Sequence, residues 1–147
     1  MISLSMAAGS FLLPKILPLF KRRTALLIVT YSIQSAMIFV VGSSSSFYLA
    51  VAAFLIFAFS MGLGGPAKQA YLHSMIPSDQ RATIISFDSL IGSTGSVIGQ
   101  TGLRVLSQEV SIASGYIAGG FVTILTVPIL IMLKKSEDTQ DYYKKEI

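Results

Sequence analysis

No charged residue occurs between residues 24 and 67, and this uncharged stretch restricts what the chain can fold into. The segment GSSSS (42–46) divides it into two apolar runs of about 20 residues, the length at which a helix crosses a hydrocarbon core. Backbone polar groups in lipid must bond within the chain, so each run predicts a transmembrane helix. Charged residues are only 12% of the chain, against about a quarter in an ordinary soluble domain. Lipid is therefore the solvent that this composition fits.

The remaining apolar runs predict an all-α, polytopic transmembrane helix bundle. A short run at residues 1–13 precedes the first basic cluster, and no basic residue precedes it, so it does not resemble a signal peptide. We favour a chain that begins inside a helix, while a true start at Met1 is the alternative. The expected elements are a truncated helix at 1–13, spans at 24–42, 47–66 (extending to about 76), 80–103 and 111–133, and a cytoplasmic tail at 134–147.

The basic residues follow the predicted topology. Every lysine and arginine except Arg104 lies in alternate loops or in the tail. This positive-inside pattern predicts that Lys15–Arg23, Lys68–Arg81 and the tail face the cytoplasm, in a multi-pass protein of the inner (plasma) membrane. The net charge of +4 is then a topology signal, so we expect the lipid bilayer as a partner and no nucleic acid.

Few residues of this chain could support catalysis or metal binding. There is no cysteine, and His73 is the only histidine, so neither a disulfide framework nor a metal site is expected. Asp88 is the one acidic residue within a predicted span. No paired carboxylates or nucleophile–base arrangement is evident, so we expect no enzymatic activity and no cofactor.

Several polar residues cluster where the second complete span meets the third. Pro66 cannot donate a backbone hydrogen bond, so a kink is expected there. We expect Lys68 to extend its amine to the lipid head groups. Pro77 should end the helix, and Ser78 or Asp79 should cap the next one.

A glycine stripe accompanies the acid in the next span. Gly92, Gly95, Gly99 and Gly102 recur every three or four residues, so they share one helix face with Asp88. Small residues let another helix approach closely, which predicts a packing role for the stripe. Asp88 should face protein or a water-filled cavity. Two roles remain open for it: a structural bond at a helix contact, or gating and proton coupling.

These features together resemble the C-terminal part of a major facilitator superfamily transporter, in the style of multidrug-efflux-like proton antiporters. The segment IPSDQRATIISFDSL carries the resemblance, because Pro77, Arg81, Ala82 and Ser86 match a P-x-x-x-R-A pattern with a following serine. The resemblance covers essentially the whole chain. It implies that the four complete spans are helices 9–12 of a twelve-helix fold, within its C-terminal six-helix half.

The resemblance implies secondary active transport of a small molecule, as efflux coupled to protons by alternating access, with the N-terminal half of the transporter missing. It makes Arg81, Asp88, Lys68 and Asp79 candidates for transport or gating. Phe57 and Ser60 become cavity candidates, since the helix that carries them lies near the cavity in such transporters. Gly9 and the basic residues 21–23 are similar to the two ends of the family's loop motif, although the motif's acid and inner glycine are absent.

Two other functions remain open. The chain could be a small stand-alone membrane interaction or assembly protein with four or five helices, in which case Met1 is a true start. A membrane enzyme is the third possibility, and it requires ionisable residues clustered at one depth.

Overall fold

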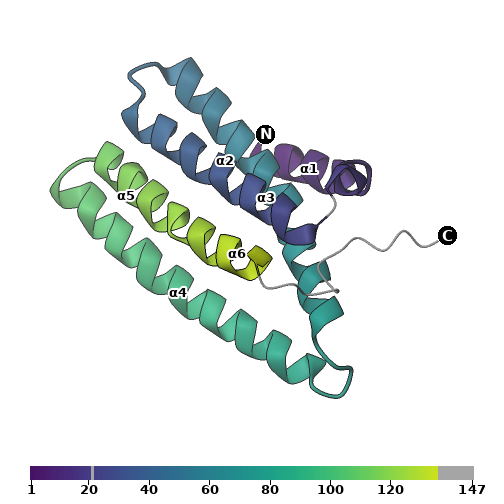
Figure 1. Cartoon of the computed structure of the whole chain (residues 1–147). Coiled ribbons are helices and arrows are strands. Elements are labelled where there is room, and N and C mark those ends of the chain that lie inside the picture. Colours follow the sequence, from purple (N-terminus) through teal and green to yellow (C-terminus); the bar gives the residue numbers. More distant parts are fainter. Residues whose placement is uncertain (21, 136–147) are drawn as a thin grey trace.

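The computed structural model describes residues 1–20 and 22–135, and within them the chain is all α-helical, as predicted. The expected tail at 134–147 lies almost wholly outside the described residues. Figure 1 shows the arrangement of the elements. They are α1 (Ile2–Ile16), the short 3-10 helix η1 (Leu17–Leu19), α2 (Arg23–Ser43), α3 (Phe47–Met75), α4 (Arg81–Glu109), α5 (Ile112–Ile124) and α6 (Thr126–Lys135).

Among residues 1–20 and 22–135, four segments are long and apolar enough to cross a membrane: Ile2–Leu19, Arg23–Ser43, Phe47–Ser74 and Ile112–Met132. The first of them extends beyond the truncated helix expected at 1–13. Helix α4 is long enough to span but is not among the four. Helix α4 is less apolar than the other spans because it contains several glycines and serines and Asp88. Polar residues within a span are tolerated where the helix faces protein.

The turns lie at two opposite ends of the bundle. In Figure 1 the α2–α3 turn and the α4–α5 turn lie at the left, whereas the α3–α4 turn, the start of α2 and the end of α6 lie at the right. The described parts of the segments expected to face the cytoplasm therefore share one end. We call it the inner end, and the side of the membrane that it faces stays a prediction.

The expected last span at 111–133 is divided into two helices. Helix α5 ends at Ile124 and α6 begins at Thr126. Pro128 has no backbone N–H, so it cannot bond the carbonyl four residues earlier, at Ile124. The helix is interrupted at the position that this missing bond predicts. Helix α3, by contrast, continues through Pro66.

The expected cap of α4 is wrong. Gln80 occupies the N-cap position without a side-chain cap bond, and the helix begins at Arg81. The Gln80 N–H instead donates to the Pro77 carbonyl at 3.2 Å, closing a turn. This turn places Ser78 and Asp79 before the cap, so neither side chain takes that position.

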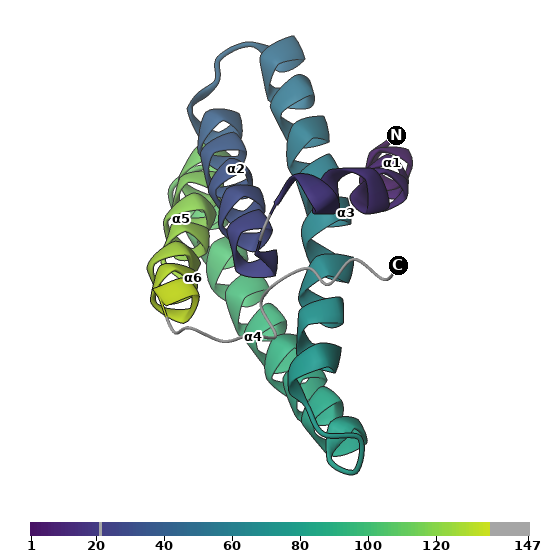
Figure 2. The same cartoon turned by 45° about the vertical axis from the view of Figure 1, so that its right-hand side comes forward.

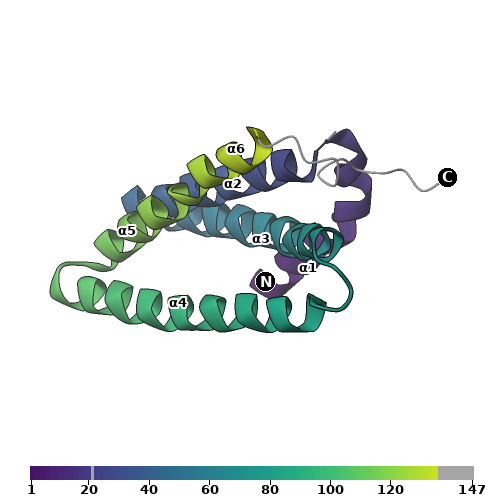
Figure 3. The same ribbon diagram turned by 60° about the horizontal axis from the view of Figure 1, so that its bottom comes forward.

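Helices α1, α2 and α3 form the packed part of the molecule. A small core gathers Leu26 and Leu27 of α2 against Ala67 of α3, with Leu13 of α1 packed beside them. Helix α2 also packs along α5. Figure 2 shows α1 crossing beside α3. Figure 3 shows α4 along the lower edge, apart from α2 and α3, and α4 contains no buried residue.

Two arginines tie the inner end of α2 to its neighbours. Arg22 donates through Nη1 to the carbonyl of Lys134 on α6 at 2.6 Å. Arg23 donates through Nη1 to the carbonyl of Ala70 on α3 at 3.0 Å. Charge-assisted bonds of this kind are among the stronger hydrogen bonds. The basic cluster therefore also has a structural role, because it holds three helices together at one end.

Candidate functional site at the α3–α4 seam

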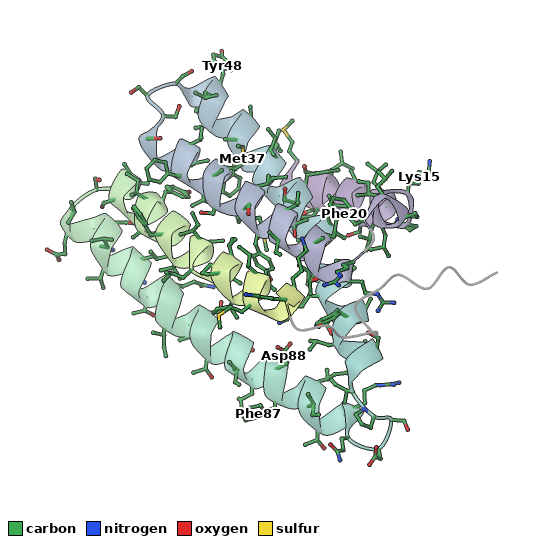
Figure 4. All side chains as sticks on the ribbon, viewed as in Figure 1. Lys15, Phe20, Met37, Tyr48, Phe87 and Asp88 are labelled. Carbon is green, nitrogen blue, oxygen red and sulfur yellow. The ribbon has the colours of Figure 1, made fainter. Side chains whose placement is uncertain are left out.

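Lys68 of α3 and Asp88 of α4 form an ion pair across the two helices. The Lys68 Nζ donates to both carboxylate oxygens of Asp88, at 2.9 and 3.1 Å. The side chains remain 42% and 31% exposed within this chain. Asp88, labelled in Figure 4, therefore faces protein as its helix face predicted. The expectation that Lys68 extends to the head groups is wrong, because an opposite charge lies within reach.

This ion pair lies where α3 and α4 are otherwise poorly connected. Helix α4 packs mainly against α5, and few of its residues approach α3. The pair is therefore the main polar link across the α3–α4 seam in the part of the chain that the structure describes.

Arg81 binds the turn rather than an acid. Its Nη2 donates to the carbonyl of Ile76, the C-cap of α3, at 3.3 Å. Its Nε is buried without a hydrogen-bond partner. Asp79 is exposed on the turn, and no ion pair joins it or Arg81 to Lys68 and Asp88 among the described residues. The structure thus brings two of the four gating candidates together, and a gating role for any of them stays a prediction.

Helix α1 meets α3 at the turn of helix before Pro66. Because Pro66 has no N–H, the carbonyl of Gly62 loses its helical partner. Ser10 of α1 supplies a replacement, since its hydroxyl donates to the Gly62 carbonyl at 3.0 Å. Gly9 and Gly62 face each other's helices so closely that a Cβ on either would overlap backbone oxygen of the other helix. Gly9 thus lies within a helix crossing, and its likeness to one end of the family's loop motif stays a prediction.

An apolar cleft of about 550 Å³ opens on the outer half of α4. Phe57 of α3 lines it, together with Leu103, Leu106 and Tyr116. Phe57 therefore lines a cleft of this chain, and its place in a transport cavity stays a prediction. Ser60 is buried in the helix packing and does not line the cleft, so its role in a cavity stays a prediction.

The glycine stripe of α4 faces open space within this chain. A Cβ added at Gly92, Gly95, Gly99 or Gly102 would meet no atom within 4 Å. Gly99 and Gly102 line the apolar cleft. No helix among the described residues therefore packs closely on the stripe. Its packing role stays a prediction for a partner beyond these residues.

Sequence reasoning missed two contacts. The Lys68–Asp88 pair had a signal, because the two opposite charges lie at similar distances on either side of the α3–α4 turn and therefore at similar depth. The sequence signal for the Ser10–Gly62 bond was incomplete. Pro66 identifies the Gly62 carbonyl as a free acceptor, but nothing in the sequence identifies its donor. A donor on a different helix requires the helix packing to be known.

Comparison with known proteins gives one match. The sequence profile described as Major Facilitator Superfamily matches residues 1–146, which is nearly the whole chain. No curated protein and no solved structure matches the chain.

Proposed function

The chain belongs to the Major Facilitator Superfamily, a family of membrane transporters for small molecules rather than of enzymes, and we propose that it contributes to proton-coupled efflux by alternating access. In this mechanism one half of the transporter rocks against the other around a site at mid-membrane. We place the chain in the C-terminal half, with the N-terminal half as its partner and its tail in the cytoplasm.

The ion pair between Lys68 and Asp88 is the observation that carries this proposal. An ionisable residue in a span is a functional candidate because its charge is costly in lipid. Lys68 is the charged group that faces Asp88 from α3. Helix α5 also packs on α4, and its one titratable side chain is Tyr116. The other charged residues of α4 itself are Arg81, Arg104 and Glu109. Protonation of Asp88 would break the pair and release α4 from α3.

The partner half is supported by α4. This helix has no buried residue, and its glycine face is open. Exposed small residues permit a close helix approach. A helix from the other half of the transporter, seated on that face during part of the cycle, would give α4 the burial that this chain alone does not provide.

Transport measurements on the full product of the gene test the proposal. The purified protein would be reconstituted in liposomes, and efflux of candidate solutes measured under an imposed pH gradient. We expect a proton gradient to drive solute movement in the parent protein. Asp88→Asn should abolish the pH dependence while leaving substrate binding measurable. An Asp88→Asn protein that follows the parent across pH would remove proton coupling from Asp88.

Cysteine labelling tests the proposed orientation. These 147 residues contain no cysteine, and any cysteine elsewhere in the full gene product would be replaced first. We expect Ser45→Cys to react with a membrane-impermeant maleimide applied from outside, and Ser78→Cys to react only from inside. Reaction of both from the outside would contradict a cytoplasmic α3–α4 turn.

A small membrane assembly protein is the second candidate, and the unburied α4 favours it equally, because another copy could cover the same face. The gene sequence upstream of Met1 separates the two. An in-frame continuation with further apolar spans supports the transporter, whereas a stop codon and a ribosome site just before Met1 support the small protein.

A further inference from the structure

Arg104 lies near the outer end of α4, the end at the α4–α5 turn on the left of Figure 1. The side chain is exposed, and no hydrogen bond or ion pair to it is found among the described residues. Glu109 follows five residues later on α4, which places the two side chains about 140° apart around the helix axis. The Arg104 guanidinium is therefore available to a ligand.

A pocket of about 320 Å³ between α4 and α5 is lined by Arg104 together with Gln100, Ser107 and Tyr116. The Ser107 hydroxyl lies against α5, because a Cβ on Gly115 would overlap its oxygen. Neither the Ser107 nor the Tyr116 hydroxyl has a hydrogen-bond partner in the part of the chain that the structure describes. No described carboxylate lines the pocket. Donors without acceptors around a guanidinium fit an anionic ligand.

The pocket lies at the depth of the lipid head groups. Arg104 is five residues from the end of α4 at Glu109, about 8 Å of helix. Tyr116 is four residues after the start of α5 at Ile112. The head-group layer is about 5–8 Å thick on each side of the hydrocarbon core, and tyrosine is enriched there. Lipid phosphates are the anions present at this depth.

The pocket continues into the apolar cleft, since Leu103, Gly115 and Tyr116 line both. The cleft extends to Ile98, toward the middle of α4. Ile98 and Val122 line the cleft and are 68% and 66% exposed, so an apolar chain can enter it from the surface. Donors at head-group depth above an apolar cleft match the order of phosphate and acyl chain in a phospholipid.

We propose that the pocket and the cleft together bind one anionic phospholipid, with its phosphate at Arg104 and one acyl chain in the cleft. An anionic lipid fits better than a zwitterionic one, because no described carboxylate lines the pocket to receive a head-group ammonium. Gly95 does not line the cleft, so the inner part of the glycine stripe stays open to a partner helix. The site does not depend on which solute is moved or on proton coupling.

Photo-crosslinking of the full gene product in nanodiscs tests the proposal. The probe is phosphatidylglycerol with a diazirine in one acyl chain, diluted in phosphatidylcholine. The matched probe is phosphatidylethanolamine with the same chains. Labelled residues would be read by mass spectrometry after proteolysis. We expect phosphatidylglycerol to label the residues of α4 and α5 that line the cleft, and phosphatidylethanolamine to label them less.

Four variants assign the labelling to the site. Arg104→Gln should lower it about fivefold, the loss expected for one basic residue at an anionic membrane surface. Arg104→Lys keeps the charge and should retain most of the labelling. Gly102→Leu should also lower labelling, because the leucine would occupy the cleft while Arg104 is unchanged. Gly95→Leu is its matched control on the same face, outside the cleft, and should label like the parent.

Several results would overturn the proposal. Equal labelling of the parent and Arg104→Gln, or by the two lipids, would show that bulk lipid fills the cleft without selection. A parent protein with no label in the cleft would show that another helix covers it. Excess inorganic phosphate is the third probe, with potassium chloride of equal ionic strength as control. Loss of labelling in phosphate alone would identify a site for the free anion instead of a lipid.

Discussion

The glycines of the α1–α3 crossing and those of α4 have opposite surroundings. At Gly9 and Gly62 a Cβ would overlap backbone atoms of the facing helix. At Gly92 and Gly95 a Cβ would meet nothing within 4 Å. Glycine in a helix costs about 1 kcal/mol relative to alanine, so each position needs a compensating reason. For Gly9 and Gly62 the compensating reason is a close helix contact within the chain. Gly92 and Gly95 have no such contact within the chain.

The α1–α3 crossing is thus a complete helix contact within this chain, whereas the glycine face of α4 has no helix packed on it. At the α1–α3 crossing the close approach is accompanied by a hydrogen bond from Ser10 to a carbonyl that Pro66 leaves free. Along α4 the ion pair to Lys68 is the main polar contact with α3. The closest packing of the chain thus joins α1, α2 and α3, with α5 along α2, whereas α4 offers an exposed face to a partner.

The largest effect is expected from adding a methyl group at the packed crossing. Gly62→Ala would drive a Cβ into the Met6 carbonyl of α1, and overpacking of this kind costs about 1–3 kcal/mol. Gly92→Ala is the matched control on α4 and should not lower stability. Thermal unfolding of both variants in detergent would measure the difference. Equal losses would show that the two regions do not differ as described.

A smaller effect is expected from Gly95→Leu, and on a different property. The leucine has open space within this chain, so the yield of folded protein should change little. It should weaken contact with a helix seated on the stripe, by about 1 kcal/mol on the scale of membrane helix contacts. Transport rate per folded molecule reports this loss. Unchanged transport would indicate that the stripe faces lipid.

The smallest effect is expected at Ser10. Ser10→Ala leaves the Gly62 carbonyl without its donor, and side-chain hydrogen bonds between membrane helices average about 0.6 kcal/mol. Ser10→Thr keeps the hydroxyl and serves as the control. Both would be compared in the same unfolding measurement. An alanine variant as stable as the threonine variant would show that the bond is not needed at Pro66.

The sequence predicted the helical class and most of its divisions for a clear physical reason. Uncharged runs of span length in a chain this apolar have few alternatives, so α2 and α3 begin and end within a few residues of their predicted bounds. The division of the last span was not predicted: one helix was expected at 111–133, but the structure has an interruption between Ile124 and Thr126. Local sequence shows that a bond is missing, and the surrounding packing decides what replaces it.

The candidate site was predicted in part. The helix face of Asp88 followed from periodicity, because Asp88 and the glycines repeat at helical spacing. The pairing of Asp88 with Lys68 was not predicted, because the Lys68 amine was expected to extend to the lipid head groups. The openness of the glycine stripe also could not be predicted, since spacing identifies a face but not what lies opposite it.

Oxygen accessibility of a spin label on α4 in native membranes tests most directly whether its glycine face meets a partner. The label would be attached at Gly95→Cys and compared with two references near mid-span, Leu63→Cys in the packed interior and Phe121→Cys on an exposed face. Molecular oxygen concentrates in lipid, so a lipid-facing label relaxes faster than a covered one. We predict that the Gly95 label resembles the Leu63 label. A Gly95 label as accessible as the Phe121 label would contradict the account, because the stripe would then face lipid.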